Sequence, residues 1–168
     1  KTDFNEVNPD YIYITHVHWD HWHGPTLKKF LNKNITIITH DEPNKRSYRD
    51  LNNFGFKNIK ILKHGETFQM NEIKITPYQF GLFLNDSALV IETPDYNILN
   101  ANDCKIAGQS LDQIMKNHGK FQFAFRSHSS ANDRVCYKIK DSDQTFDDPL
   151  HYSRSFKLFM DHVKPKYA

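Results

Sequence analysis

The stretch of the chain that most clearly indicates chemistry holds three histidines and one aspartate within six residues. His16, His18, Asp20 and His21 follow directly after an apolar run, Tyr11–Ile14, that reads as a β-strand. Side chains alternate between the two faces of a strand, so His16 and His18 point the same way if the chain stays extended. Two imidazoles then converge on one point, and a tight turn would bring Asp20 and His21 to a second point close by.

This donor set predicts a metal site. Imidazole suits zinc, iron and manganese, and a carboxylate is a harder ligand, so we expect one or two divalent transition-metal ions. Zinc is the first expectation, with iron or manganese as alternatives. A histidine-rich surface turn is the competing interpretation, but four residues of ligand type in this order after a hydrophobic strand favour metal.

The pattern His-x-His-x-Asp-His after a strand resembles the signature of the metallo-β-lactamase fold superfamily. The resemblance implies three further ligands in chain order: a middle histidine, an aspartate that bridges two metals, and a last histidine near the C-terminus. Ile98–Asn102 is a short strand-like segment followed by an acid, so Asp103 is the candidate for the bridging position. The predicted metal ligands are His16, His18, Asp20, His21 and Asp103.

Longer segments narrow the resemblance to one branch. Asp86–Cys104 and Phe125–Arg134 are similar to the catalytic domain of the CMP-N-acetylneuraminate hydroxylase family and its bacterial relatives. Lactonase and phospholipase D branches share the same fold. Phe156–Ala168 resembles the helix and strand start that precede the last metal ligand in these branches.

The chain departs from this resemblance in two places. Thr76–Leu84, where the middle histidine is expected, contains none, so one metal position is a ligand short. His40 and His64, each at the end of a predicted strand, are the alternatives for that ligand. The last histidine is expected beyond residue 168, and the first strands of the fold before residue 1. We therefore expect residues 1–168 to form a single domain that is an internal portion of a larger protein.

Strand and helix patterns alternate along the chain, which predicts an α/β fold: a layered αββα sandwich of the metallo-β-lactamase type, incomplete at both ends. The expected helices span residues 26–32, 44–53, 110–117 and 153–163. The expected strands are residues 11–14, 35–39, 59–62, 87–92, 96–99 and 121–125, with two more around the turn at residues 70–71. The strand ends must position the ligands.

Two further residues are predicted to contact a small-molecule substrate. His128 follows a predicted strand in a small-residue loop that the related hydroxylases place near the substrate, and Gln79 lies near the expected position of the middle histidine.

Composition excludes several classes of partner. The net charge of the 168 residues is +2, and lysines and arginines are scattered, so no basic stripe indicates nucleic acid. No apolar run approaches the ~20 residues that span a bilayer. Cys104 and Cys136 form no recognisable disulfide framework, so we expect a cytoplasmic protein.

Three functions remain open. A metal ion lowers the pKa of bound water from near 16 to about 7, which supports hydrolysis of an ester, lactone or phosphodiester, with Asp20 as the catalytic residue that orients the hydroxide. This metal-dependent hydrolase is the first expectation. A non-haem di-iron oxygenase, resembling the CMP-N-acetylneuraminate hydroxylases, is the second. A degenerate, non-catalytic scaffold is the third.

Overall fold

The structure is a computed structural model that describes residues 6–81, 84–127 and 150–168. Within these ranges the chain builds two β-sheets and four helices. The predicted substrate residue His128 lies outside the described residues. None of the helices in these ranges is both long and apolar enough to cross a lipid bilayer.

The first sheet is parallel and comes from the N-terminal part of the chain. Its strands run in the order β1 (Tyr11–Ile14), β2 (Thr36–His40) and β3 (Asn58–Leu62). Parallel neighbours need long crossover connections, and helices α1 (Gly24–Lys29) and α2 (Arg46–Asn53) lie in them. The strands carry their carboxyl ends to one edge of the sheet, where the histidine motif begins.

The second sheet is mixed and comes from the rest of the chain. Its strands run in the order β4 (Phe68–Met70), β5 (Ile73–Phe80), β6 (Asp86–Glu92), β7 (Asn97–Asn102) and β8 (Phe123–Arg126). Neighbouring strands are antiparallel except for β7 and β8, which are parallel and joined through helix α3 (Gly108–His118). Helix α5 (His151–Val163) follows in the last described range.

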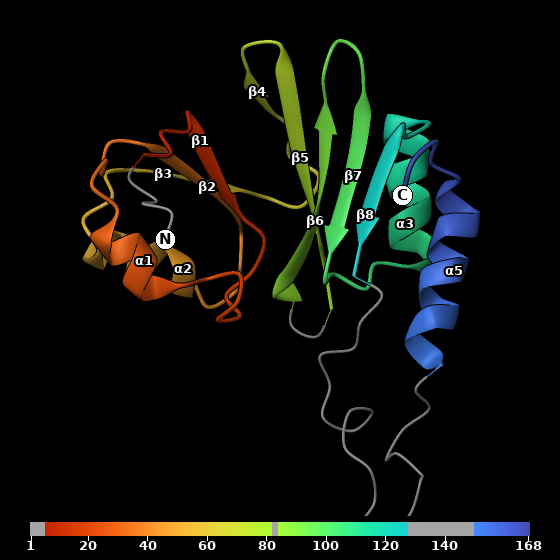
Figure 1. Ribbon diagram of the computed structural model, residues 1–168, viewed down its shortest axis with the longest axis horizontal. Coiled ribbons are helices and arrows are strands. Elements are labelled where there is room, and N and C mark those ends of the chain that lie inside the picture. Colours follow the sequence, from red (N-terminus) through yellow and green to blue (C-terminus); the bar gives the residue numbers. More distant parts are fainter. Residues whose placement is uncertain (1–5, 82–83, 128–149) are drawn as a thin grey trace, which may run out of the picture.

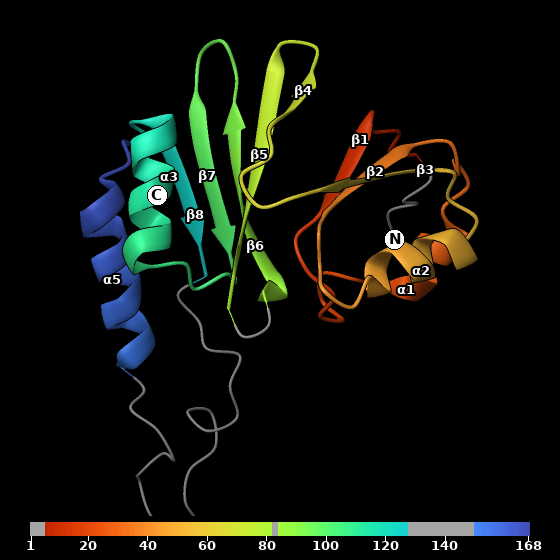
Figure 2. The same cartoon turned by 180° about the vertical axis from the view of Figure 1, so that it is seen from behind.

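The layers form an αββα sandwich. Figures 1 and 2 show α1 and α2 beside the first sheet, and α3 and α5 covering the face of the second sheet that is turned away from the first. Successive side chains of a strand point to opposite faces of its sheet. Ile37 therefore packs in the core on the helix side of the first sheet, whereas Ile38 packs with Leu62, Ile75 and Leu89 between the two sheets. The Tyr13 hydroxyl also lies 2.7 Å from Ser87 Oγ across the two sheets. The predicted fold class is confirmed.

The boundaries of several elements differ from the predictions by one to three residues. The strand β7 continues to Asn102 instead of ending at Leu99, and α5 begins at His151 instead of Ser153. The extension of β7 matters for function, because it carries the chain directly to Asp103.

Candidate metal centre

The histidine motif leaves β1 and folds back on itself. The strand ends at Ile14, and the carbonyl of His18 then accepts hydrogen bonds from the backbone N–H groups of His21 (3.0 Å) and Trp22 (2.6 Å). Trp22 is buried and stacks against Phe54 at 6.4 Å, which anchors the turn in the core. The turn returns the His21 ring to the His16 ring, with centroids 4.3 Å apart.

A bulge at the end of β7 aims the next ligand. The pairing register with β8 shifts between Asn100 and Asn102, and Asn102 adopts a left-handed backbone with a φ of 50°. Bulges bend a strand and redirect side chains near functional sites. The Asp103 carboxylate then lies 3.0 Å from Nε2 of His21, a residue 82 positions earlier in the chain.

Three ligand atoms therefore meet between the edges of the two sheets. One ligand atom each of His16, His21 and Asp103 lies within 4.8 Å of the other two. Atoms bound on opposite sides of one ion, at about 2.1 Å each, are about 4 Å apart, so a small closure would let all three contact a single cation.

The surroundings of His16 fit a metal ligand. Its side chain is 3% exposed, and its Nε2 is buried without a hydrogen-bond partner among the described residues. A buried polar atom without a partner is costly, and a bound cation would satisfy it. Burial lowers the pKa of His16, and the rings of His18 and His21 act in the same direction, against the carboxylates of Asp86 and Asp103. The neutral imidazole that results is the form that binds metal.

The other two predicted ligands lie at the rim of this cluster. The His18 ring stands perpendicular to that of His16 at 4.6 Å, and the Asp20 carboxylate lies 3.5 Å from Nε2 of His21. Both side chains are exposed. All five predicted ligands are thus linked by contacts, but His21, rather than His18, is the second histidine of the group of three.

Asp86 is a candidate that the sequence analysis missed. It begins β6, opposite Phe80, and its carboxylate acts on the pKa values of both His16 and His40. The signal that could have found it is an acid at the start of a strand, directly after the segment where the middle histidine is lacking.

The alternatives for the middle ligand do not join the group of three. His40 is buried at the end of β2, whereas His64 is exposed and accepts a hydrogen bond from the backbone N–H of Gln79 at 3.1 Å. The Gln79 side chain is 6% exposed and donates to the carbonyls of Asp41 (2.8 Å) and Leu84 (3.3 Å). The Gln79 side chain therefore links the segments that follow β2 and precede β6. Its predicted contact with substrate stays a prediction.

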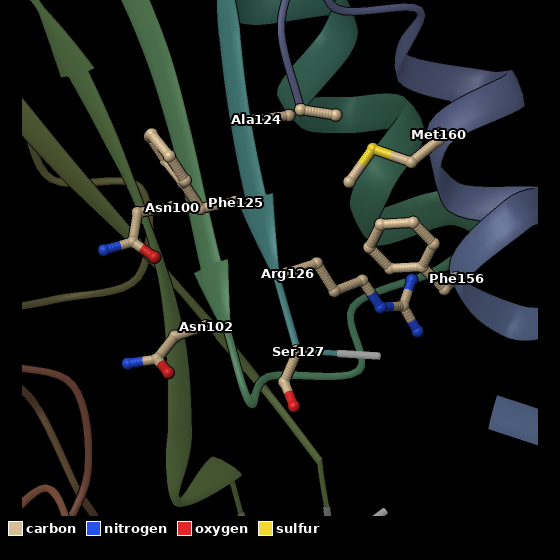
Figure 3. Close-up of a pocket in the computed structure, with 9 residues that line it drawn as sticks. Asn100, Asn102, Ala124, Phe125, Arg126, Ser127, Phe156 and Met160 are labelled. Carbon is tan, nitrogen blue, oxygen red and sulfur yellow. The ribbon is translucent and has the colours of Figure 1, made fainter. Parts of the chain in front are cut away.

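A pocket of about 310 Å³ adjoins the centre through Asn102 (Figure 3). Asn100 and Asn102 project from one side of β7, whereas the Arg126 guanidinium points the other way, toward α5. There Arg126 donates to Ser155 Oγ at 2.8 Å and lies 4.7 Å from the centre of the Phe159 ring.

Comparison of the sequence with known proteins gives one distant curated relative and no matching family model. The relative, from Mycolicibacterium smegmatis, is named as a Rieske 2Fe-2S iron–sulfur protein and is 24% identical in an alignment of 130 residues. The match covers 73% of this chain and 25% of the relative. The chain therefore spans about a quarter of the length of the curated protein it matches.

Comparison of the structure gives clearer likenesses. A variant of the CmlA β-hydroxylase is similar over 94% of this chain and 36% of its own, with a TM-score of 0.66 and 15% identity. A protein from Veillonella parvula, described as a possible metal-dependent hydrolase, is similar over 94% of this chain and 60% of its own, with a TM-score of 0.63 and 11% identity. The fold common to these proteins, with its two facing sheets and outer helices, is the fold described above. The chain has the metallo-β-lactamase fold.

Proposed function

We propose that this chain is the metal-binding part of an enzyme that acts on a small molecule. The convergence of His16, His21 and Asp103 carries the proposal, since one ligand atom of each lies within 4.8 Å of the others. In addition, His16 Nε2 is buried without a hydrogen-bond partner among the described residues. Two histidines with one carboxylate are the donor set of many catalytic metal sites that keep open positions for substrate.

The candidate metal ligands divide into a primary set and an exposed rim. His16, His21 and Asp103 would hold one ion. Asp86, whose carboxylate acts on the pKa of His16, is the candidate for the ligand that the middle histidine would have supplied. His18 and Asp20, on the exposed side, would hold a second ion. Such ions would supply either activation of dioxygen or an acidified water, depending on the metal.

Asp20 is the residue proposed to act on the reacting atoms. Its carboxylate is 47% exposed and lies 3.5 Å from Nε2 of His21, so it is open to solvent at the side of the cluster. A carboxylate in this place can accept a proton from a bound water or from a substrate hydroxyl.

Hydroxylation is the reaction we favour. The site lacks one imidazole and holds carboxylates instead, and oxygen ligands together with two histidines suit iron. The curated relative is named for an iron–sulfur centre, and CmlA is named a diiron β-hydroxylase, which supports this choice. In such a reaction one oxygen atom of O2 enters a C–H bond and the other leaves as water, with two electrons and two protons from a reductant.

Hydrolysis, which the sequence analysis placed first, is the second candidate. The likeness to the Veillonella protein supports it, and zinc binds the same donor set. The substrate would then be an ester, lactone or phosphodiester.

The experiment that tests the proposal compares the two metals on the full-length protein. The protein is loaded with Fe²⁺ or Zn²⁺, and a substrate panel is followed by O2 consumption with a reductant and by ester, lactone and phosphodiester cleavage. The hydroxylase proposal expects turnover with iron and O2 and inhibition by zinc. Turnover with zinc and without O2 would replace it with the hydrolase.

Two variants test the site itself. His21→Ala should reduce turnover by about 10²-fold or more with either metal, because it removes an ion-holding side chain. His151→Ala is the control, since His151 is exposed at the start of α5. Equal activity of the two variants would remove His21 from the proposed site. No turnover of any panel substrate with either metal would instead favour the non-catalytic scaffold.

A further inference from the structure

The geometry points to Thr15 and Asn102 as one hydrogen-bonded pair that positions both His16 and His21. This inference rests on the proposed metal centre and names the residues that orient its ligands. Thr15 follows β1 in the first sheet, and Asn102 ends β7 in the second. The pair therefore supports from both sheets a site whose ligands also come from both.

Thr15 decides which nitrogen of His16 is free. The Thr15 hydroxyl lies 3.0 Å from Nδ1 of His16, while Nε2 has no partner among the described residues. If the hydroxyl donated to Nδ1, the ring hydrogen would sit on Nε2, buried and without an acceptor, which is unfavourable. Nδ1–H therefore donates to Thr15, and the lone pair of Nε2 faces the place of the ion.

Asn102 joins this arrangement to His21. Its amide nitrogen lies 3.3 Å from the Thr15 hydroxyl and 3.4 Å from Nδ1 of His21, so one NH₂ group serves both. The other nitrogen of His21 faces the Asp103 carboxylate, which only accepts hydrogen bonds. Without metal, the His21 ring hydrogen is therefore on Nε2, and Nδ1 accepts from Asn102.

An asparagine suits both states of His21. When an ion takes the place of the hydrogen on Nε2, the neutral ring must carry its hydrogen on Nδ1. Rotation of the Asn102 amide by half a turn then presents its oxygen as the acceptor. A residue that only donates or only accepts could serve one state alone.

The backbone explains why an asparagine stands at this position. Asn102 has a φ of 50°, a conformation that asparagine tolerates better than most residues. The same bulge turns the next residue, Asp103, toward His21. Figure 3 shows Asn102 projecting from the side of β7 opposite to Arg126. The bulge at the end of β7 thus directs the ligand Asp103 toward the site and also places Asn102 against His21.

Three substitutions separate this role from general damage. Thr15→Val keeps the shape of the side chain and removes the hydroxyl, and Thr15→Ser returns the hydroxyl. Asn102→Gly removes the amide while the left-handed backbone is kept without strain. Asn100→Ala is the matched control, because Asn100 projects from the same side of β7 (Figure 3) but, among the described residues, its side chain is not hydrogen-bonded to either histidine, unlike that of Asn102.

The first readout uses the metal-free, full-length protein. The ¹⁵N chemical shifts of the imidazole nitrogens report which nitrogen carries the hydrogen. We expect Nδ1–H for His16 and Nε2–H for His21 in the parent protein and in Thr15→Ser. In Thr15→Val, His16 should populate Nε2–H, and in Asn102→Gly the preference of His21 should weaken.

The second readout is the affinity for Zn²⁺, measured by competition with a chromophoric chelator. Thr15→Val and Asn102→Gly should each lose about 10–100-fold, while Thr15→Ser and Asn100→Ala stay near the parent value. Unchanged ring hydrogens in Thr15→Val and Asn102→Gly would overturn the inference, as would unchanged affinity in both. A parent protein that binds no metal would refute the proposed function alone, because the nitrogen shifts test the pair without metal.

Discussion

At the scale of single residues, the chemistry of a side chain depends on which neighbours bury or face it. His16 and His40 are both histidines at or beyond a strand end, and both are buried. His16 meets two other ligand-type side chains. The carboxylates of Glu42 and Asp86 act on His40, but within the described ranges they form no group of three ligand atoms with it. We therefore expect His16 to bind metal and His40 to contribute to stability in a pH-dependent way, although both are buried histidines.

His40 should make the protein less stable in mild acid. Burial lowers the pKa of its imidazole, and this effect outweighs the opposite effect of Glu42 and Asp86. The unfolded chain then takes up a proton at about pH 6.5, where the folded protein does not, so the free energy of unfolding falls as the pH drops below that value. Urea unfolding between about pH 7.5 and about pH 5 measures this loss. His40→Gln should flatten the pH dependence, and His151→Gln should not; equal slopes for the parent and His40→Gln would contradict this account.

Asp86 should contribute to metal binding. Its carboxylate acts on His16, so its removal should weaken Zn²⁺ binding by about tenfold or more whether it contacts the ion or only orients His16. Chelator competition with Asp86→Asn measures the effect. Asp95→Asn, in the exposed turn between β6 and β7, is the control. An Asp86→Asn variant that binds like the control would remove Asp86 from the candidate ligands.

At the scale of elements, helix α3 packs against the second sheet and thereby fixes the position of the end of β7. Ile114 of α3 is fully buried in the cluster that also contains Leu99 and Ala101 of β7. Those two residues alternate with Asn100 and Asn102, which face the other side of the sheet. The packing of α3 thus sets the direction in which Asn102 and Asp103 leave the strand.

Ile114→Ala should destabilise the fold by about 2–5 kcal/mol, because it leaves a cavity in this cluster. Chemical denaturation gives the value. Leu158→Ala on α5 is the comparison, since Leu158 is 69% exposed and its loss should change stability by no more than about 0.5 kcal/mol. Similar effects of the two substitutions would show that α3 does not pack as described.

At the scale of the whole molecule, the metal centre lies where the two sheets face each other. His16 and His21 follow the first sheet, and Asp103 follows the second. Tyr13, Ser87 and Thr15 connect the sheets close by, since the Ser87 hydroxyl donates to the Thr15 carbonyl at 2.8 Å and Tyr13 reaches Ser87. An ion at this place would link the two halves of the sandwich.

Zinc should therefore raise the melting temperature. At about one hundred times its dissociation constant, a ligand that binds only the folded state adds about 2.7 kcal/mol, which corresponds to a rise of about 5–10 °C for a chain of this size. Calorimetry with and without a chelator measures the shift. Asp103→Asn should lose the rise and Asp95→Asn should keep it; a rise of equal size in Asp103→Asn would place the ion elsewhere.

The amino-acid sequence by itself determined the types of donor and the identity of the fold. The spacing of His16, His18, Asp20 and His21 after an apolar strand is a local pattern, and local patterns survive in the structure because they depend on strand period and turn geometry. The alternation of strand and helix signals likewise led to the αββα sandwich, with boundary errors of a few residues.

Only the tertiary structure decided which donors meet. His21 and Asp103 are 82 residues apart, and the 3.0 Å between their side chains depends on the packing of two sheets that no local pattern encodes. The turn at His18 brings His21, rather than the predicted His18, into the group of three with His16. The bulge at Asn102 determines the direction of the Asp103 side chain. The roles of Asp86 as a candidate ligand and of Thr15 as a residue that positions His16 could not be predicted from the sequence for the same reason. Each role depends on neighbours that only long-range packing brings within a few ångströms.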